Sequence, residues 1–149
     1  MEIKLLLKDE LKRLNKLCIS GENWADVYYK KLDTFYTGVV KTYAIVSDGN
    51  YIAEITAYED SLKKYESLAV NGETVQVLDH KVAADARGHK LGTQLLKYVL
   101  KLYRNRGYKY ALVKLFKDSD AYLSSYYKRC GFTTVFEETD ASVVLSMEL

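Results

Sequence analysis

The chain has no proline, one tryptophan and two cysteines among its 149 residues. With no proline, the ends of helices and strands have to be read from glycines and polar residues. Cys18 and Cys130 have neither the spacing of a metal site nor that of a disulfide framework. This favours a cytosolic, reduced protein and leaves pairing of the two open. The apolar run near residue 5 is too short for a secretory core or a membrane span, so we expect a cytoplasmic protein that enters no membrane.

Charge of one sign is also scarce. The net charge is only +2 at pH 7, which does not require a nucleic-acid partner. The 14 tyrosines are interleaved with lysines, and such a pattern could stack on bases. The lysines form no dense cluster, however. We therefore interpret the tyrosines as strand and surface residues and do not expect nucleic acid to bind.

Hydrophobic spacing divides the chain into strands and helices. The expected strands are 2–8, 39–46, 51–58, 74–82, 110–116 and a final antiparallel pair around Thr139-Asp140; the expected helices are one begun by Asp9, 23–32, 91–106 and a short one within 117–132; 59–73 is expected to be a loop with one helical turn around 62–67. Asp48-Gly49 is a hairpin signal between two strands. Gly107 and Gly131 are typical of left-handed helix ends, with Phe132 as the apolar follower.

Strand 74–82, helix 91–106 and strand 110–116 form a crossover unit, so the two strands should be parallel and near each other. The other strands are expected to pair antiparallel. We therefore expect an α/β fold with a mixed, mostly antiparallel sheet, a parallel central pair and helices on both faces, in a single domain over residues 1–149.

The stretch DARGHKLGTQLLKYVL, residues 85–100, joins a strand to a strongly amphipathic helix. A helix start leaves amide hydrogens without partners and carries partial positive charge. Gly88 lets the backbone approach a ligand, and Gly92 leaves room that a side chain would fill. Arg87 and Lys90 add charge, so the junction could hold a pyrophosphate. The alternative is that Gly88 only makes the turn and Gly92 packs on a neighbour.

Two motifs resemble signatures of the GCN5-related N-acetyltransferase (GNAT) superfamily. In RGHKLGTQLLKYV, Arg87 and Gly92 match the ends of a pattern of Arg or Gln, two residues, Gly, one residue and Gly or Ala. Gly88 matches a common variant. Lys90 stands on the middle glycine, where lysine fits if its backbone is already helical.

The second motif is DAYLSSYYKRCGF, near the end of the chain. Asp120 stands at the asparagine of the family's pattern, and Tyr127 stands at its tyrosine, three residues before Gly131-Phe132. The order of elements resembles the family's over nearly the whole chain, so the expected sheet is GNAT-like.

The resemblance implies acetyl-CoA as co-substrate, in a splay between strands 74–82 and 110–116. Its pantetheine arm would pair with the strand backbone, and a strand amide near Val82 would polarise the thioester. Its pyrophosphate would lie on the amides of the loop. The cofactor-binding residues that this implies are His80, Lys81, Val82, Arg87, Gly88, His89, Lys90, Leu91, Gly92, Thr93 and Asp120, and no metal is expected.

The resemblance also implies direct attack by an amine while both substrates are bound. Tyr127 would be the general acid. A phenol titrates near ~10, so it is neutral at pH 7 and can protonate the departing sulfur. The alternative is a core tyrosine on the helix face that it shares with Leu123. Tyr126 should point elsewhere on the helix.

No general base is assigned. Many members of the family use a glutamate on the strand before the loop, and the aligned residue here is Gln76, which cannot take a proton. Asp79 lies on the other face of the strand by alternation. His80, Glu54 on the neighbouring hairpin and proton loss through water all stay open.

These inferences predict an acetyl-CoA-dependent N-acetyltransferase that acts on a primary amine of a small molecule or peptide. A homodimer and a longer acyl group both stay open. The alternative, kept because of Lys90 and Gln76, is a non-catalytic CoA-binding or interaction module on the same fold. Acetylation of a charged tRNA or of a protein would need a dense basic patch, which the sequence does not show.

Overall fold

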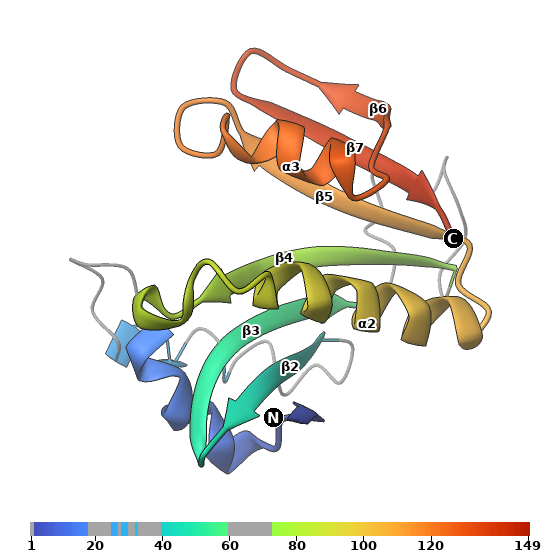
Figure 1. Cartoon of the computed structure of the whole chain (residues 1–149). Coiled ribbons are helices and arrows are strands. Elements are labelled where there is room, and N and C mark those ends of the chain that lie inside the picture. Colours follow the sequence, from blue (N-terminus) through green and yellow to red (C-terminus); the bar gives the residue numbers. More distant parts are fainter. Residues whose placement is uncertain (1, 18–24, 27, 30–31, 33–39, 60–72) are drawn as a thin grey trace. The chain divides into compact units, whose positions relative to one another are not determined.

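The computed structural model describes residues 2–17, 25–26, 28–29, 32, 40–59 and 73–149 (Figure 1). Its strands are β1 (Glu2–Leu5), β2 (Val40–Ser47), β3 (Asn50–Tyr58), β4 (Thr74–Val82), β5 (Tyr110–Phe116), β6 (Thr134–Glu138) and β7 (Ser142–Glu148). Its helices are α2 (Leu91–Asn105), α3 (Leu123–Arg129) and the 3-10 segments η1 (Lys8–Leu17) and η3 (Ala84–Ala86). The described residues of the expected helix 23–32 are helical, and the turn expected around 62–67 lies outside the described residues. Among the described residues, no helix has the length and apolarity to cross a membrane.

In this part of the chain, the strands form a seven-stranded sheet in the order β1-β2-β3-β4-β5-β7-β6. β4 and β5 pair in parallel, from Thr74 opposite Tyr110 to Val77 opposite Val113. The pairs β1–β2, β5–β7 and β6–β7 are antiparallel. The mixed, mostly antiparallel sheet with a parallel central pair is therefore confirmed, as is the crossover through α2.

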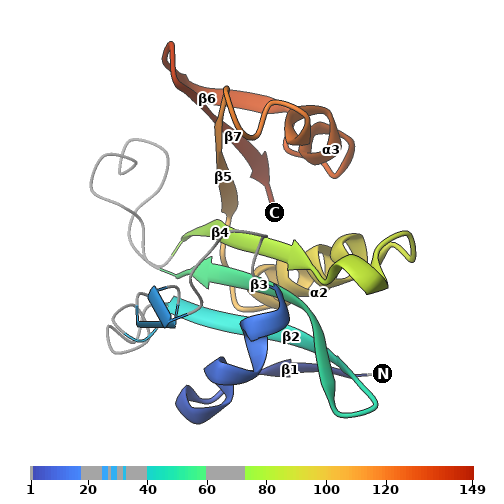
Figure 2. The ribbon, with the colours of Figure 1, turned by 90° about the vertical axis from the view of Figure 1, so that its left-hand side faces the viewer.

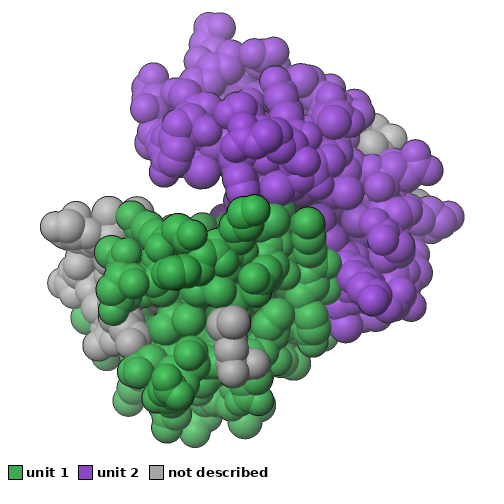
Figure 3. Space-filling model, viewed as in Figure 1, with its two compact units in different colours: residues 1–57, 79–99 green, residues 58–78, 100–149 purple. Residues whose placement is uncertain are grey.

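Contacts divide the chain into two compact units (Figure 3). Unit 1 comprises residues 1–57 and 79–99, and unit 2 comprises residues 58–78 and 100–149. The loop after β4 therefore belongs to unit 1, whereas Tyr127 belongs to unit 2.

In unit 1, strands β2 and β3 are joined by Asp48 and Gly49, whose φ angles are 51° and 76°. Two successive positive φ angles are typical of a type I′ turn, which matches the twist of the flanking strands. Glycine adopts this region freely, and aspartate is among the few other residues that visit it. The predicted hairpin is confirmed.

The core of unit 1 lies where η1 meets the sheet. One cluster of buried residues contains Leu6, Leu11, Leu14, Ala44, Tyr51 and Ala83. Leu91, Leu95 and Val99 of α2 are also buried, at 6%, 0% and 1% exposure. Figure 2 shows η1 and the first part of α2 on opposite faces of β2 and β3. Both helices thus bury the apolar stripe that their spacing predicts.

The start of η1 is held by Glu10. The Leu7 N–H donates to Glu10 Oε1 at 3.0 Å, as in helices whose third residue reaches back to the cap. The expectation that Asp9 begins this helix is wrong. Glu10 Oε2 also accepts hydrogen bonds from Lys4 Nζ at 2.5 Å and from the Tyr51 hydroxyl at 2.7 Å. Glu10 thus ties β1, η1 and β3 together.

These contacts set a pH dependence. The hydrogen bond from Lys4, with help from Tyr51 and the Leu7 amide, lowers the pKa of Glu10 to about 2 from an ordinary 4.5. A carboxyl group whose pKa is lowered by folding binds more protons in the unfolded state as the pH falls. Its stabilisation is therefore complete above pH 4.5 and is lost as the pH falls towards 2.

We expect Glu10→Gln to flatten the pH dependence of the free energy of unfolding between about pH 5 and pH 2, because the titrating carboxylate is gone. Urea unfolding across this interval measures the slope. Asp9→Asn removes an exposed carboxylate from the adjacent position and should keep the wild-type slope. Identical slopes for wild type and Glu10→Gln would contradict the assignment.

In unit 2, α2 ends in a Schellman motif. Gly107 has a φ of 91°, its N–H donates to the Arg104 carbonyl at 3.0 Å, and the Tyr108 N–H donates to the Tyr103 carbonyl at 3.0 Å. This pair of bonds satisfies carbonyls that the helix leaves open, and the left-handed residue between them favours glycine. The predicted cap at Gly107 is confirmed.

The same helix end surrounds Glu59, which follows β3 and is 8% exposed. Arg106 Nη1 and Nη2 donate to its two carboxylate oxygens at 2.7 and 3.3 Å, and the Tyr103 hydroxyl donates to Oε1 at 2.6 Å. The Tyr108 hydroxyl donates to the Glu59 carbonyl at 2.9 Å. The guanidinium of Arg106 lies 5.0 and 5.3 Å from the centroids of the two tyrosine rings. A buried carboxylate is thus neutralised and hydrogen-bonded where α2 ends.

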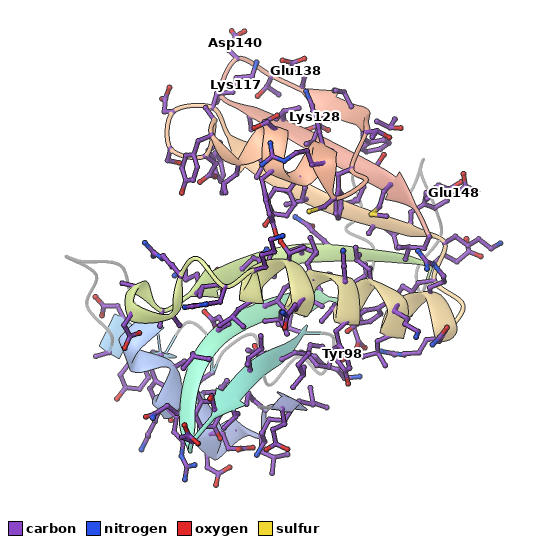
Figure 4. All side chains as sticks on the ribbon, viewed as in Figure 1. Tyr98, Lys117, Lys128, Glu138, Asp140 and Glu148 are labelled. Atoms are coloured by element: carbon purple, nitrogen blue, oxygen red, sulfur yellow. The ribbon has the colours of Figure 1, made fainter. Side chains whose placement is uncertain are left out.

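Arg106→Met should lower the free energy of unfolding by about 2–3 kcal/mol, because it leaves a buried carboxylate without its cation. The side chain of Arg106 is 39% exposed, which keeps the loss below that of a fully buried pair. Urea unfolding at neutral pH measures the change. The control is Lys117→Met, which breaks an ion pair of 2.9 Å with Glu138 whose side chains are 38% and 56% exposed (Figure 4). The control should cost less than about 1 kcal/mol. If both substitutions lowered the free energy of unfolding equally, the ion pair between Arg106 and Glu59 would contribute no more than an exposed pair.

Candidate functional site

The loop between β4 and α2 contains two left-handed residues. Gly88 has a φ of 88° and Lys90 a φ of 59°. The Gln94 N–H donates to the Lys90 carbonyl at 3.0 Å, so Lys90 is the residue that caps the start of α2. Lys90 thus fits the position of the middle glycine with a left-handed backbone, and not with the helical backbone that the sequence set as the condition. The left-handed region costs a residue with a Cβ about 1–2 kcal/mol, and glycine avoids this cost.

The loop gathers amide donors and positive charge. The amides in the first turn of α2 point towards the start of the helix, which carries partial positive charge. Residues 87–90 are exposed. Arg87 Nε donates to the Val82 carbonyl at 3.2 Å, which holds this guanidinium beside the end of β4. The arrangement suits an anionic group such as a phosphate.

Gly92 packs against β4. A Cβ placed on Gly92 would lie 3.3 Å from His80 Nε2 and 3.3 Å from Val82 Cγ2. Such distances are tighter than most Cβ contacts. The room that the sequence assigns to a ligand at Gly92 is therefore filled by the chain's own side chains, and the alternative reading, in which Gly92 packs on a neighbour, is right at this position.

His80 joins the strand to the helix. Its Nε2 lies 2.7 Å from the Gly92 carbonyl oxygen. A carbonyl only accepts, so Nε2 carries the proton and donates. Burial lowers the pKa of His80, and the bond to Gly92 opposes this more weakly, so the ring is neutral at pH 7. Sequence reasoning missed the contact; its one signal was strand alternation, which places His80 and Val82 on the same face of β4.

Tyr127 lies in the last turn of α3, which Figure 1 shows along the face of β5 and β7. It is 3% exposed, and its ring meets Phe132 edge-on with centroids 5.7 Å apart. Burial raises the pKa of Tyr127, so its phenol is neutral at pH 7. The Tyr126 ring meets that of Tyr127 edge-on, with centroids 5.1 Å apart, but Tyr126 is only partly buried.

The cap of α3 confirms the second predicted helix end. Gly131 has a φ of 110°. Its N–H donates to the Lys128 carbonyl at 3.1 Å, and the Phe132 N–H donates to the Tyr127 carbonyl at 3.0 Å. The pattern of tyrosine, three residues, glycine and an aromatic thus forms one kind of helix end at residues 127–132, and it also occurs at residues 103–108.

The repeat bears on the role of Tyr127. Tyr103 occupies the corresponding place at the end of α2, is 0% exposed, and meets the Tyr108 ring edge-on at 5.0 Å. Packing within the cap therefore accounts for a buried tyrosine at this position, as the core alternative holds. A catalytic role for Tyr127 has to come from its hydroxyl.

Asp120 closes the loop after β5. Its Oδ2 accepts the Phe116 N–H at 3.0 Å, and its own N–H donates to the Phe116 carbonyl at 2.7 Å. The first residue before α3, Tyr122, makes no side-chain cap. The start of α3 therefore has no side-chain cap, and the Asp120 carboxylate instead binds within the loop after β5.

Gln76, which aligns with the family's base, and the candidates Glu54 and Asp79 lie on two strands. Gln76 on β4 is 7% exposed, and Glu54 on β3 is 1% exposed. Asp79 is partly buried. Among the described residues, no group of three or more histidine, cysteine, aspartate or glutamate side chains is placed to hold a metal ion.

The chain matches the acetyltransferase (GNAT) family over residues 9–132. No curated protein matches it in sequence. Among the many solved structures of similar fold, three illustrate the match. They are a PaiA N-acetyltransferase from Thermoplasma acidophilum in complex with coenzyme A (TM-score 0.72, 15% identity, 100% of each chain covered), an IAA acetyltransferase from Bacillus cereus (0.69, 17%, 99% of each) and an aminoglycoside 6'-acetyltransferase type Ii (0.71, 16%, 99% of this chain and 97% of the other).

Replacing Lys90 should separate backbone strain from charge. Lys90→Gly removes both the side chain and the left-handed strain, whereas Lys90→Ala removes only the side chain. We expect Lys90→Gly to be more stable than Lys90→Ala by about 1 kcal/mol in urea unfolding. Equal stabilities would mean that Lys90 does not hold a left-handed backbone in solution.

Proposed function

Because the chain belongs to the acetyltransferase (GNAT) family, we propose that it is an acetyl-CoA-dependent N-acetyltransferase that moves an acetyl group to a primary amine. The observation that carries the proposal is the junction after β4. Left-handed Gly88 and Lys90 lead into the start of α2, at the place where the family's phosphate-binding pattern falls. The family match covers this junction and Tyr127 together.

The residues of the junction fit the pyrophosphate of acetyl-CoA. The first-turn amides of α2 supply donors, and exposed Arg87 and Lys90 supply positive charge beside them. We assign the pyrophosphate to residues 87–93. We assign the pantetheine arm to the backbone of His80, Lys81 and Val82, as a peptide-like arm can extend a strand. When bound, acetyl-CoA supplies the activated acyl group. Asp120, whose carboxylate holds its own loop, would contribute through its backbone.

The reaction needs one proton donor. The amine nitrogen forms a bond to the thioester carbonyl carbon, the carbon–sulfur bond breaks, and its electron pair stays on sulfur. Tyr127 gives its phenolic proton to that sulfur. Burial raises the pKa of Tyr127, which keeps its phenol protonated at pH 7, and the phenolate left after the transfer regains its proton from water. Gln76 cannot accept the amine's proton, so we place no base at its position and propose that the proton leaves through water.

The proposal extends to the domain organisation, the location and the acceptor of the protein. We propose a single acetyltransferase domain over residues 1–149, in the cytoplasm, with a small-molecule or peptide amine as acceptor. The solved structures of similar fold include an enzyme named for aminoglycosides, which supports small-molecule amines as the first class to test.

The matched pair Tyr127→Phe and Tyr103→Phe tests the general acid, because both tyrosines occupy the same place in the same kind of cap. We expect Tyr127→Phe to lower kcat by about 100-fold with little change in the affinity for acetyl-CoA. Tyr103→Phe should lower the free energy of unfolding by about 1 kcal/mol, through its lost bond to Glu59, and leave kcat near wild type. Thiol release from acetyl-CoA with a panel of primary amines measures turnover.

Two results would count against the proposal. Equal kcat in wild type and Tyr127→Phe would leave Tyr127 as a packing residue of the cap. Binding of acetyl-CoA without thiol release for any amine would favour the second candidate, a CoA-binding module without catalysis. The glutamine at the usual base position favours that candidate.

A further inference from the structure

One contact of the junction is not explained by the phosphate-binding pattern. His80 Nε2 lies 2.7 Å from the carbonyl oxygen of Gly92, and this oxygen belongs to the first turn of α2. His80 lies on β4, so the bond fastens a strand to the turn that begins the helix. Within unit 1, this hydrogen bond fixes the backbone of the first turn of α2, directly after the four exposed residues 87–90.

The bond also acts on a particular amide. The Gly92 carbonyl and the Thr93 N–H belong to one peptide group, in which the oxygen faces along α2 and the N–H faces its start. A donor on the oxygen draws electron density from the nitrogen and strengthens the N–H as a donor, because hydrogen bonds in a chain polarise one another. Thr93 is the third residue of α2, and its N–H is one of those that a helix leaves facing its N-terminus.

We propose that His80 is a positioning residue for the coenzyme: its Nε2–H holds the Gly92 carbonyl, fixes the first turn of α2, and polarises the Thr93 amide towards the phosphates. The inference rests on the proposed function, since it takes the phosphates to be those of acetyl-CoA. It assigns His80 a role different from that of a base.

The surroundings of Gly92 support this role. A side chain at Gly92 would press on both His80 Nε2 and Val82 Cγ2, at 3.3 Å from each, so glycine allows strand and helix to approach closely enough for the bond. Burial of the ring keeps it neutral, and a neutral ring with its proton on Nε2 leaves only the Nδ1 lone pair to accept. The nitrogen that faces the helix therefore cannot remove a proton from a substrate.

Two substitutions separate the hydrogen bond from the space that the ring fills. His80→Phe keeps a ring of similar size and has no donor. His80→Gln carries an amide nitrogen at a reach comparable to that of Nε2 and can still donate. Tyr98→Phe serves as the control on α2, because Tyr98 is 42% exposed and lies away from the junction (Figure 4).

Titration calorimetry with CoA gives the first readout. His80→Phe should raise the Kd about tenfold, which corresponds to about 1.4 kcal/mol, and His80→Gln should stay within about threefold of wild type. The same loss is expected with ADP, which carries a pyrophosphate. In turnover assays, KM for acetyl-CoA should rise, while kcat and KM for the amine should change by less than about twofold. A general fall in stability would not raise KM for acetyl-CoA while leaving KM for the amine unchanged.

NMR on the ligand-free protein gives a readout that needs no activity. The chain has two histidines, so the imidazole nitrogens of His80 can be compared with those of exposed His89. His80 should show the proton on Nε2 at neutral pH. The Thr93 amide proton should shift upfield in His80→Phe and keep its position in His80→Gln.

Three outcomes would overturn the inference. The first is a proton on Nδ1, which would leave Nε2 unable to donate to a carbonyl. The second is a wild-type Kd for CoA in His80→Phe. The third is an equal loss in His80→Phe and His80→Gln, which would make ring packing the cause. A wild-type protein that binds no CoA would instead remove the proposed function itself, and the calorimetric control Tyr98→Phe would then show no binding either.

Discussion

The hydrogen bond between His80 and Gly92 is the contact on which the junction depends. The chain leaves β4 with the Ala83 amide bonded to the Ile52 carbonyl at 2.8 Å, and it is fastened again at Gly92. Between these two points, residues 84–85 and 87–90 are exposed, and Gly88 and Lys90 have left-handed conformations. A short segment with both ends fixed has little conformational freedom to lose on binding, so less of the binding energy is spent on ordering it.

In unit 2, the ends of the helices also hold side chains in a fixed position. The caps at Gly107 and Gly131 each hold a tyrosine ring against the aromatic residue after the glycine. In one cap the hydroxyl serves Glu59. In the other cap, we propose that the Tyr127 hydroxyl protonates the departing sulfur. A tyrosine whose ring is already fixed by the end of its helix needs no reorganisation to present its hydroxyl, which is the condition for an efficient donor in a transition state.

The parts of the fold that the sequence predicted are those that local chemistry decides. Asp48-Gly49, Gly107 and Gly131 were found because only few residue types tolerate positive φ. The parts that failed depend on the tertiary structure. Asp9 carries a capping side chain, yet Glu10 holds the start of that helix, since a carboxylate binds whichever amide the fold brings to it. The site is similar: glycine spacing located the loop, whereas no pattern in the sequence pairs His80 with Gly92.

Lys90 shows that a chain can keep the backbone geometry of a sequence pattern without keeping the residue type that the pattern specifies. The family's pattern is written in residue types, with glycine at this position, but the property that the loop uses is a left-handed φ, and Lys90 has one. A strict residue pattern would pass over this chain, while a pattern written in dihedral angles would accept it. Related chains with asparagine, aspartate or lysine at this position therefore belong among the candidates for a working phosphate loop, because these residues can also reach the left-handed region when the surrounding structure holds them there.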